Sequence, residues 1–252
     1  MTPKPFSDHF KDVARQYAES RPGYPAALFD WLAAQCADRA CAWDCGAGSG
    51  QASVMLARDF RRVIATDASP TQIAQARAHE RVEYRVAPAE ASGLPDQSVD
   101  LVAVAQALHW FDLEAFYREV RRVARPDGVF AAWTYGVMMV EGDAVDRLLR
   151  AYYHETVGPW WPAERRHVET GYRDLPFPFQ PLEAPPLFLQ ATWDLDQMLG
   201  YLRSWSATAR FMAARGFDPV AELTVGLAPA WGGAHRQRLV HWPMAVRAGR
   251  VA

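Results

Sequence analysis

The chain has 252 residues, 50% of them hydrophobic, and its 27 basic and 29 acidic side chains leave a formal net charge of −2. This length suffices for one α/β domain with an insertion. The charge balance lacks the basic excess of a nucleic-acid-binding protein, and the sequence shows neither a membrane span nor the apolar stretch of a signal peptide. We therefore expect a cytoplasmic protein, monomeric or homodimeric, without nucleic-acid or membrane partners.

The three cysteines, Cys36, Cys41 and Cys45, lie in apolar surroundings. Their odd number and the lack of ligand pairs at the spacings of metal sites indicate free thiols and no metal centre. Buried free thiols are typical of proteins kept in a reducing compartment.

The first half of the chain alternates apolar runs with helical patterns. Residues 6–37 are expected to form two helices separated by the breaker segment 21–25, R-P-G-Y-P. Strands are expected at residues 41–45, 62–67, 82–86, 99–105 and 129–134, and helices at 50–58, 69–79 and 112–124. Ser69 is the expected N-cap of the second of these helices, and segment 126–128, P-D-G, is an expected turn. Such alternation implies a parallel sheet with right-handed crossovers.

The pattern changes after Tyr135. Residues 136–186 contain an expected helix at 144–156, followed by a partly irregular stretch dense in proline and aromatic residues. An insert of this length is usually a lid or a binding element, and its aromatic content argues against disorder. A strand at 187–193, a helix at 195–210 and a last strand at 238–246 are expected next. The sequence thus predicts one domain over 1–252, made of an N-terminal helical lid (6–37), a core (38–135), a substrate-side insert (136–186) and the returning sheet (187–252).

The most informative segment, 43–51, reads W-D-C-G-A-G-S-G-Q, with an acid and three alternating glycines after a predicted strand. The next predicted strand ends in Asp67, and these parts together form half of a nucleotide-binding βαβ unit. A dinucleotide fingerprint, G-x-G-x-x-G, requires its third glycine one residue after Gly50, where this chain has Gln51. The spacing therefore disfavours NAD, while an ordinary βα turn of an unrelated α/β protein stays an alternative.

The D-x-G-x-G-x-G pattern resembles motif I of the class I S-adenosylmethionine-dependent methyltransferases. Segments 105–112 (A-Q-A-L-H-W-F-D) and 119–128 (E-V-R-R-V-A-R-P-D-G) are similar to the methyltransferase type 11 branch of that family. The positions Tyr17, Arg21, Pro22, Tyr24 and Pro25, with segment 202–207, resemble its trans-aconitate-methyltransferase-like subgroup. The resemblance implies a Rossmann-like, seven-stranded, mostly parallel sheet with helices on both faces and an antiparallel last strand. It also implies S-adenosyl-L-methionine as cofactor and a small-molecule methyl acceptor, with carboxylates among the acceptors to consider.

The resemblance also assigns cofactor contacts residue by residue. The methionine tail would lie on Gly46, Gly48 and Gly50, with Asp44 and Gln51 beside them. Asp67 would accept the ribose hydroxyls, Ala68, Ala89 and Glu90 would meet the adenine, and Gln106 and Ala107 would line the cofactor after the fourth strand. Pro88 stands where the family often has an acid, so Glu90 is the candidate for that contact. As alternatives, Asp44 caps the following turn and Glu90 is a solvated loop acid.

On the acceptor side, His109 is the only plausible neutral-pH base near the expected mouth of the active site. A carboxylate acceptor needs no base, whereas a phenol or carbon acid does. The expected acceptor-side residues are Tyr17, Arg21, His109, Trp110, Trp160 and Trp161. The alternatives are that Tyr17 is a core residue and Arg21 a surface charge. His109 and Trp110, in the same way, would then only pack at the end of the fourth predicted strand. Segment 165–167, R-R-H, is expected to be a solvated face, with an anchor for an acidic substrate as the alternative.

Two other functions stay open from the sequence. One is a catalytically silent module of the same fold that binds the cofactor and acts as a regulator. The other is an NAD(P)-dependent oxidoreductase, which Gln51 disfavours. The complete glycine motif and Asp67 favour the methyltransferase over both.

Overall fold

The computed structural model describes residues 23–251. The strands are β1 (Cys41–Cys45), β2 (Arg62–Asp67), β3 (Val82–Val86), β4 (Val99–Ala105), β5 (Ala124–Tyr135), β6 (Met139–Val140), β7 (Gln180–Leu182), β8 (Phe188–Trp193) and β9 (Arg238–Arg250). The helices are α2 (Ala26–Gln35), α3 (Gln51–Leu56), α4 (Pro70–Ala74), α5 (Leu113–Val123), α6 (Asp143–Ala151), α7 (Arg165–Glu169), α8 (Leu195–Arg203), α9 (Ser206–Arg215) and α10 (Pro219–Trp231). A π-helical turn, Tyr152–Thr156, and two short 3-10 turns, Leu108–Trp110 and Gly158–Trp160, complete these elements.

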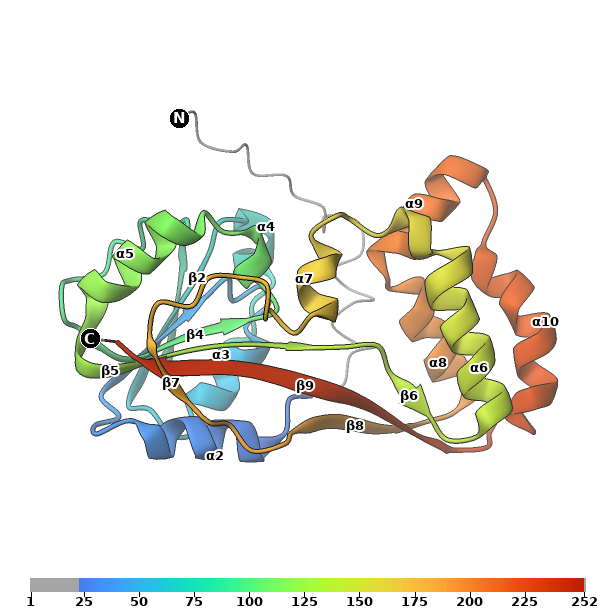
Figure 1. Cartoon of the computed structure of the whole chain (residues 1–252), viewed down its shortest axis with the longest axis horizontal. Helices are drawn as coiled ribbons and strands as arrows, with labels where there is room; N and C mark the ends of the chain where they lie inside the picture. The colour runs from blue at the N-terminus through green and yellow to red at the C-terminus, as the bar shows by residue number, and fades with distance from the viewer. Residues whose placement is uncertain (1–22, 252) are drawn as a thin grey trace.

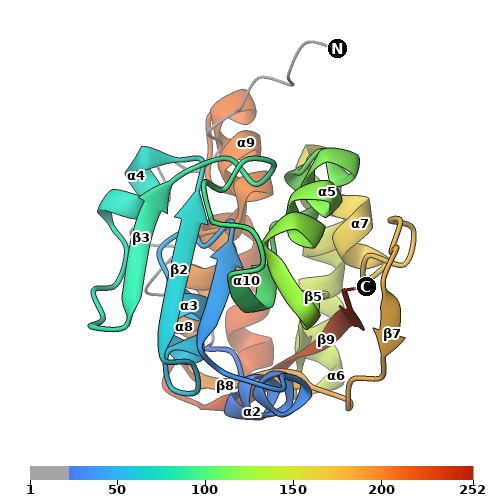
Figure 2. The same cartoon turned by 90° about the vertical axis from the view of Figure 1, so that its left-hand side faces the viewer.

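One mixed sheet organises the molecule, with the strand order β3-β2-β1-β4-β5-β9-β6. Strands β1 to β5 are parallel, and β9 is antiparallel to β5. Figure 2 shows β3 at one side of this sheet and β9 with β7 at the other. The α/β fold with an antiparallel last strand, expected from the sequence, is confirmed.

Within residues 23–251 the sheet has nine strands instead of the expected seven, because its last strand is long. β9 spans 13 residues; its C-terminal half pairs with β5 and β7, and its N-terminal half pairs with β6 and β8. The additional strands, β6 and β7, contain only 2 and 3 residues. In Figure 1, β9 runs from the core of parallel strands to the group of helices α6, α8, α9 and α10 at the opposite end.

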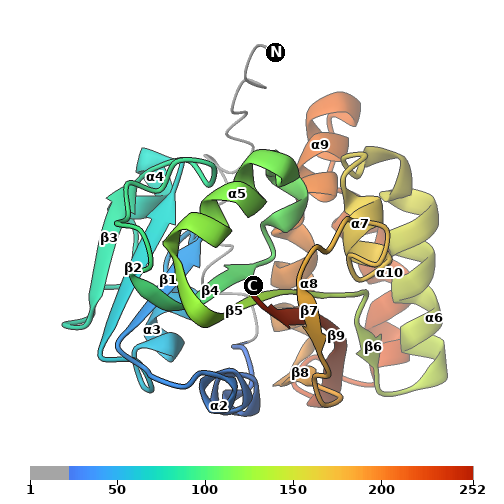
Figure 3. The same cartoon turned by 60° about the vertical axis from the view of Figure 1, so that its left-hand side comes forward.

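Alternate residues of the parallel strands face opposite helical layers. In β1, Trp43 packs in the same cluster as α5, whereas Ala42 packs with α2 and α3. In β4, Val102 belongs to the α5 cluster and Leu101 to the other. Figure 3 shows α5 and α2 on opposite sides of the strands. Both faces of the sheet are therefore covered, as the nearly continuous apolar sequences of these strands require.

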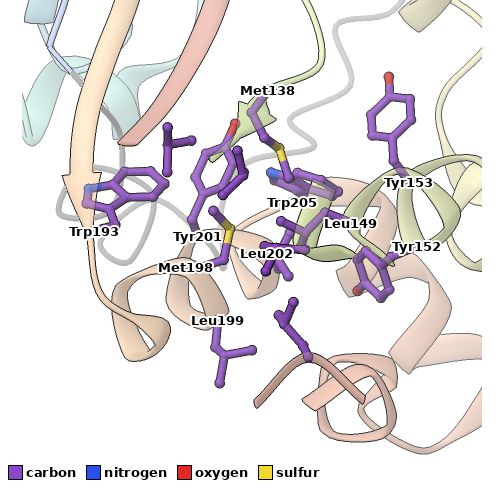
Figure 4. Packing of buried hydrophobic residues seen from close by; sticks show 14 of the residues in the cluster. Met138, Leu149, Tyr152, Tyr153, Trp193, Met198, Leu199, Tyr201, Leu202 and Trp205 are labelled. Atoms are coloured by element: carbon purple, nitrogen blue, oxygen red, sulfur yellow. The ribbon is translucent and has the colours of Figure 1, made fainter. Parts of the chain in front are cut away.

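A separate aromatic core forms beyond the parallel strands, between β8, β9 and the helices α6, α8 and α10. Figure 4 shows Tyr152, Tyr153, Tyr201 and Trp205 gathered in this region from the insert and from α8 and its C-terminal end. The insert is thus anchored by packed aromatic rings rather than left as an irregular loop, and it contains α6, α7 and β7.

The prediction of a helix at 69–79 is wrong at the C-terminal end of the helix. It begins as expected, with Ser69 as N-cap, but α4 ends at Ala74. The backbone then leaves the helix because the Arg77 N–H donates to the Ser49 carbonyl (3.1 Å). The Arg77 carbonyl in turn accepts the Tyr84 hydroxyl (2.8 Å). Tertiary bonds to the glycine turn and to β3 thus replace the last predicted turn of this helix.

The helix expected at 195–210 is two helices, α8 and α9, interrupted at residues 204–205. The Ser204 hydroxyl donates to the Tyr201 carbonyl (2.6 Å), which competes with helical bonding. Trp205 is extended, with φ −75° and ψ 137°, and its indole lies in the aromatic core. Packing of one large side chain therefore overrides the local helical pattern.

The structure differs in detail from two further predictions. The turn predicted at 126–128 lies within β5, where Asp127 has a positive φ of 62° and the pairing with β4 jumps between Val99 and Leu101. The helix predicted at 144–156 is α6 followed by the π-helical turn Tyr152–Thr156. Such π turns are frequent near functional sites.

The three cysteines are free, as predicted, with Cys41 and Cys45 buried and Cys36 half-buried. Burial raises the pKa of the Cys36 thiol to about 12, so it stays protonated and unreactive at neutral pH. No helix in the described part of the chain combines the length and the apolar character needed to cross a membrane. The first predicted helix, with Tyr17 and Arg21, lies outside the described residues.

We predict that Gly50→Ala destabilises the free protein more than Gly48→Ala. Both glycines have positive φ, 80° and 54°, which costs an L-residue about 1–3 kcal/mol. A Cβ on Gly50 would also lie 2.1 Å from the Tyr84 hydroxyl, whereas a Cβ on Gly48 meets nothing closer than 3.7 Å. Urea unfolding without ligand measures both changes, and equal losses of unfolding free energy would contradict the packing of Tyr84 on Gly50.

Candidate active site

The glycine turn follows β1 and is held against β2 and β4. The N–H groups of Gly46 and Ala47 both donate to the Thr66 carbonyl, at 2.8 and 3.0 Å. A Cβ on Gly46 would lie 2.6 Å from the Cβ of Ala107, so only glycine permits this approach. The turn therefore lies directly beside the residues that follow β4.

Asp67, at the end of β2, fixes the middle of the turn. Its Oδ2 accepts the Gly48 N–H and its Oδ1 accepts the Ser69 N–H, both at 2.8 Å. Each carboxylate oxygen can accept more than one hydrogen bond, so these contacts leave capacity for other donors. Ala68 is half-buried next to it, and Gln51, also half-buried, is the first residue of α3. The predicted cofactor residues of the first βαβ unit thus share one edge of the sheet.

Asp44 is fully buried beneath this turn. Its Oδ2 accepts a hydrogen bond from the hydroxyl of Ser53 in α3 (2.6 Å), and its Oδ1 has no hydrogen-bond partner among the residues that the structure describes. Burial raises the pKa of Asp44 to about 7, with a further contribution from the charge of Asp67. The side-chain hydrogen bond of Asp44 thus goes to α3 rather than to the turn amides, and one oxygen of this buried acid is left without a donor among residues 23–251.

The residues after β3 and β4 form the other side of the site. Ala89 is buried, and the Oε1 of Glu90 accepts the backbone N–H of Asp112 (2.9 Å). The Glu90 carboxylate therefore forms a hydrogen bond that links the loop after β3 to the N-terminal end of α5. Gln106 has a positive φ of 60°, a strained conformation of a kind often found at functional sites. Its Oε1 accepts the hydroxyl of buried Thr134 (2.7 Å).

A cavity of about 90 Å³ lies at the ends of β4 and β5, and we call it the aromatic pocket. It is lined by Gln106, His109, Trp110, Tyr135, Gly136, Val137, Met138, Tyr153, Trp161, Pro162, Arg165, Val168, Tyr201, Ser204, Trp205 and Ser206. The structure brings together four of the predicted site residues here: Gln106, His109, Trp110 and Trp161. It places Trp160 outside this lining, with its ring against Phe211 at 5.7 Å.

His109 lies between the glycine-turn side of the site and the insert. Its Nδ1 is 3.0 Å from the hydroxyl of Tyr172, and its ring is 4.8 Å from that of Trp110. Burial, helped by the nearby charges of Arg165 and His167, lowers the pKa of His109 to about 3. The imidazole is consequently neutral at physiological pH and a weak proton acceptor.

Arg165 is the cation of the aromatic pocket. Its guanidinium carbon lies 4.7 Å from the centre of the Trp161 ring, and its Nε donates to the Tyr153 hydroxyl (2.9 Å). Within residues 23–251 no carboxylate lies at ion-pair distance from it, and the buried Nε1 of Trp161 has no acceptor. Segment 165–167 is therefore not uniformly solvated, because Arg165 is half-buried while Arg166 is exposed.

Sequence reasoning missed the roles of Tyr153, Tyr201 and Trp205 in this pocket. They come from the insert and from the region of α8, and the ring of Trp205 lies 5.6 Å from that of Tyr153 and 5.5 Å from that of Tyr201. The only signal in the sequence is the concentration of aromatic residues, which does not say which of them converge. A larger hollow of about 270 Å³ between α7 and β9 contains none of the predicted site residues. In the part of the chain that the structure describes, no group of three metal-ligating side chains occurs.

Comparisons with known proteins agree with this geometry. Residues 43–132 match the family described as a methyltransferase domain. A putative methyltransferase of Dictyostelium discoideum is 36% identical over 233 residues, covering 91% of this chain and 89% of the relative. A probable S-adenosylmethionine-dependent methyltransferase of Saccharomyces cerevisiae is 31% identical over 148 residues, covering 54% of this chain and 50% of the relative. The solved structure of a putative type II methyltransferase from Anaeromyxobacter dehalogenans is 53% identical, covers 92% of this chain and 98% of that one, and superposes with a TM-score of 0.87.

The matched segment 43–132 contains the glycine turn, Asp67 and the residues after β4. The relatives from Dictyostelium discoideum and Anaeromyxobacter dehalogenans, both named as putative methyltransferases, match nearly the whole length of the chain, so a dinucleotide enzyme and a silent module are both disfavoured. The cofactor is S-adenosyl-L-methionine, and the chain belongs to the class I S-adenosylmethionine-dependent methyltransferases.

Proposed function

We propose that this enzyme transfers the methyl group to a carboxylate of a small molecule held in the aromatic pocket. Two adjacent donor groups carry this proposal: the Arg165 guanidinium, whose Nε donates to the Tyr153 hydroxyl, and the indole N–H of Trp161. Arg165 has no carboxylate partner within residues 23–251, and the Trp161 Nε1 is buried without an acceptor. An arginine fork and an indole N–H suit a carboxylate, which is acceptor-only and planar.

The residues around the glycine turn fit the cofactor. We propose that Asp67 binds the ribose hydroxyls, that the glycine turn carries the methionine tail, and that Ala68, Ala89 and Glu90 surround the adenine. The unpartnered Oδ1 of Asp44 suits the cofactor's ammonium group, and the missing Cβ at Gly48, whose position meets no atom closer than 3.7 Å, leaves the backbone of the turn open. When bound, the cofactor supplies a methyl group made electrophilic by its sulfonium.

The chain then has to align the acceptor and exclude water. Proximity and orientation can supply up to about 7–11 kcal/mol of the barrier, provided that the reacting groups are held in line. The aromatic rings of Tyr153, Trp161 and Trp205 provide an apolar wall around Arg165. Desolvation there strengthens the pairing of a carboxylate with the guanidinium.

The environment of His109 also favours an acceptor that needs no base. A carboxylate is ionised and nucleophilic at neutral pH, whereas a phenol must lose a proton. His109, with its pKa lowered to about 3, is poorly suited to take that proton. The resemblance of segment 202–207 to trans-aconitate-methyltransferase-like proteins is consistent with an acidic acceptor.

We predict that affinity for S-adenosylhomocysteine falls about tenfold from pH 8 to pH 6, since an acid with a pKa of about 7 is largely protonated at the lower pH. Asp44 must be ionised to pair with the ammonium group. Because its folded-state pKa is raised, the free protein also loses stability as pH rises towards 7, and the bound ammonium offsets this loss. Titration calorimetry at both pH values measures the effect. Asp44→Asn should bind more weakly with no such pH dependence, and a pH-independent wild type would rule out the pairing.

We predict that Arg165→Gln raises KM for the acid acceptor roughly 10–100-fold, because one charge-assisted contact of about 1.5–3 kcal/mol is lost. In the assay, small aliphatic and aromatic carboxylic acids are tested one by one as acceptors, and the cofactor carries a tritium-labelled methyl group. Alkali releases labelled methanol from methyl esters but not from ethers or methylamines.

Arg166→Gln, an exposed change in the same helix, is the matched control and should leave KM unchanged. Product that resists alkali, or transfer to neutral analogues as efficient as to the acids, would exclude the carboxylate acceptor.

A further inference from the structure

Tyr153 links the two charged residues at the ends of α7. Its side chain is 2% exposed and comes from the π-helical turn Tyr152–Thr156. The hydroxyl donates to Oε1 of Glu169 (2.6 Å) and accepts from Nε of Arg165 (2.9 Å). Arg165 and Glu169 lie four residues apart in α7, so their side chains share one face of this helix. The phenol oxygen of Tyr153 therefore bridges the guanidinium and the carboxylate.

The chemistry of the two end groups fixes the direction of both hydrogen bonds. A guanidinium has N–H donors and no acceptor, so the Tyr153 oxygen must accept from Arg165. The single phenol proton is then available to Glu169, whose carboxylate accepts it. Burial raises the pKa of Tyr153, so the phenol keeps this proton at neutral pH. The bridge therefore has one arrangement of its protons.

The bridge uses the Nε of Arg165 and leaves the two terminal amino groups of its guanidinium. The Nε carries a single N–H, and Tyr153 accepts it. The guanidinium carbon lies over the Trp161 ring, 4.7 Å from its centre. In the part of the chain that the structure describes, neither terminal amino group has a hydrogen-bond partner. A ligand can therefore pair with Nη1 and Nη2 together, but not with Nε and one amino group.

We infer that Glu169 and Tyr153 are positioning residues, which hold Arg165 so that its two terminal amino groups receive the acceptor carboxylate end-on. The role of Arg165 in binding the acceptor rests on the proposed function, whereas the bridge itself does not. A carboxylate is planar and has two acceptor oxygens, so it pairs with both amino groups in one plane. Glu169 is exposed and bonds to the phenol, so it orients the guanidinium without occupying the place of the acceptor.

Proton exchange at the Arg165 Nε tests the bridge in the free protein, without cofactor, acceptor or activity. In protein labelled with nitrogen-15 in arginine, the Arg165 Nε–H signal is identified by its loss in Arg165→Gln. We expect slow exchange with water in the wild type, and exchange about tenfold faster in Tyr153→Phe, because the bond to the phenol oxygen is lost. Glu169→Ala, a change at an exposed position, should also accelerate the exchange. An unchanged rate in either variant would overturn the inference, and Glu169→Ala decides alone if Tyr153→Phe does not fold.

Tyr152→Phe is the matched control for Tyr153→Phe. Tyr152 lies in the same π-helical turn, is also 2% exposed, and its hydroxyl bonds to Thr208 Oγ1 (2.9 Å) rather than to Arg165. This change should leave the Arg165 exchange rate as in the wild type, and an acceleration equal to that of Tyr153→Phe would contradict the assignment. In Glu169→Gln the amide oxygen can still accept the phenol proton, so exchange should stay slower than in Glu169→Ala.

Kinetics connect the bridge with the acceptor. We expect Tyr153→Phe and Glu169→Ala each to raise KM for the acid acceptor about tenfold, with Kd for S-adenosylhomocysteine unchanged. In the Arg165→Gln background the same two changes should raise KM no further, because their effect passes through Arg165. Additive effects would overturn the positioning role. If no carboxylic acid is methylated, the proposed function fails, and the exchange measurement still tests the bridge by itself.

Discussion

The antiparallel strand β9 is the constraint on which the rest of the molecule depends. Its C-terminal half pairs with β5 and completes the sheet that carries the glycine turn. Its N-terminal half pairs with β6 and β8 and carries the aromatic core of the helical end. Because a single strand pairs with elements at both ends of the molecule, it sets the position of the aromatic pocket relative to the end of β4. The same strand supplies Arg247, whose guanidinium donates to the backbone carbonyls of Tyr172 and Leu175 in the insert.

Two of the four buried side-chain atoms that lack a hydrogen-bond partner among residues 23–251 lie at the site. Buried polar groups are normally satisfied, and leaving one without a partner costs about 1–3 kcal/mol. The Oδ1 of Asp44 on the cofactor side and the Nε1 of Trp161 on the acceptor side are two such atoms. They have opposite hydrogen-bonding character, one an acceptor and the other a donor. Complementary groups on an ammonium-bearing cofactor and a carboxylate-bearing acceptor would satisfy both, and this gives the two halves of the site distinct chemical preferences.

The parts of the fold that were predicted from sequence depend on local signals. The apolar runs of β1, β2 and β4, the glycine spacing and the Ser69 cap each reflect the chemistry of adjacent residues. The parts that were missed depend on contacts between distant segments. The helix after Ser69 ends early because Arg77 bonds to Ser49 and Tyr84, and the break at Trp205 reflects packing against rings of the insert.

The residues of the candidate site also fall into those that the sequence identified and those that it did not. Asp44 and Asp67 could be chosen because they stand at fixed positions in a motif, and the structure brings both to the edge of the sheet around the glycine turn. Tyr153 and Tyr172 could not, because the insert has no motif and their positions depend on a π-helical turn and a left-handed backbone. Neither feature has a reliable signature in a single sequence. The sequence indicates Arg165 only as part of segment 165–167, where an anchor for an acidic substrate is the alternative to a solvated face.

The most direct test of this account is a structure of the protein crystallised with S-adenosylhomocysteine. The central claim is that the cofactor lies on the glycine turn with its sulfur at the mouth of the aromatic pocket. We expect the ribose hydroxyls on Asp67, the ammonium group on Asp44 Oδ1, and the sulfur facing the space between His109 and Arg165. A nucleoside bound elsewhere, or a sulfur that points away from the aromatic pocket, would contradict it.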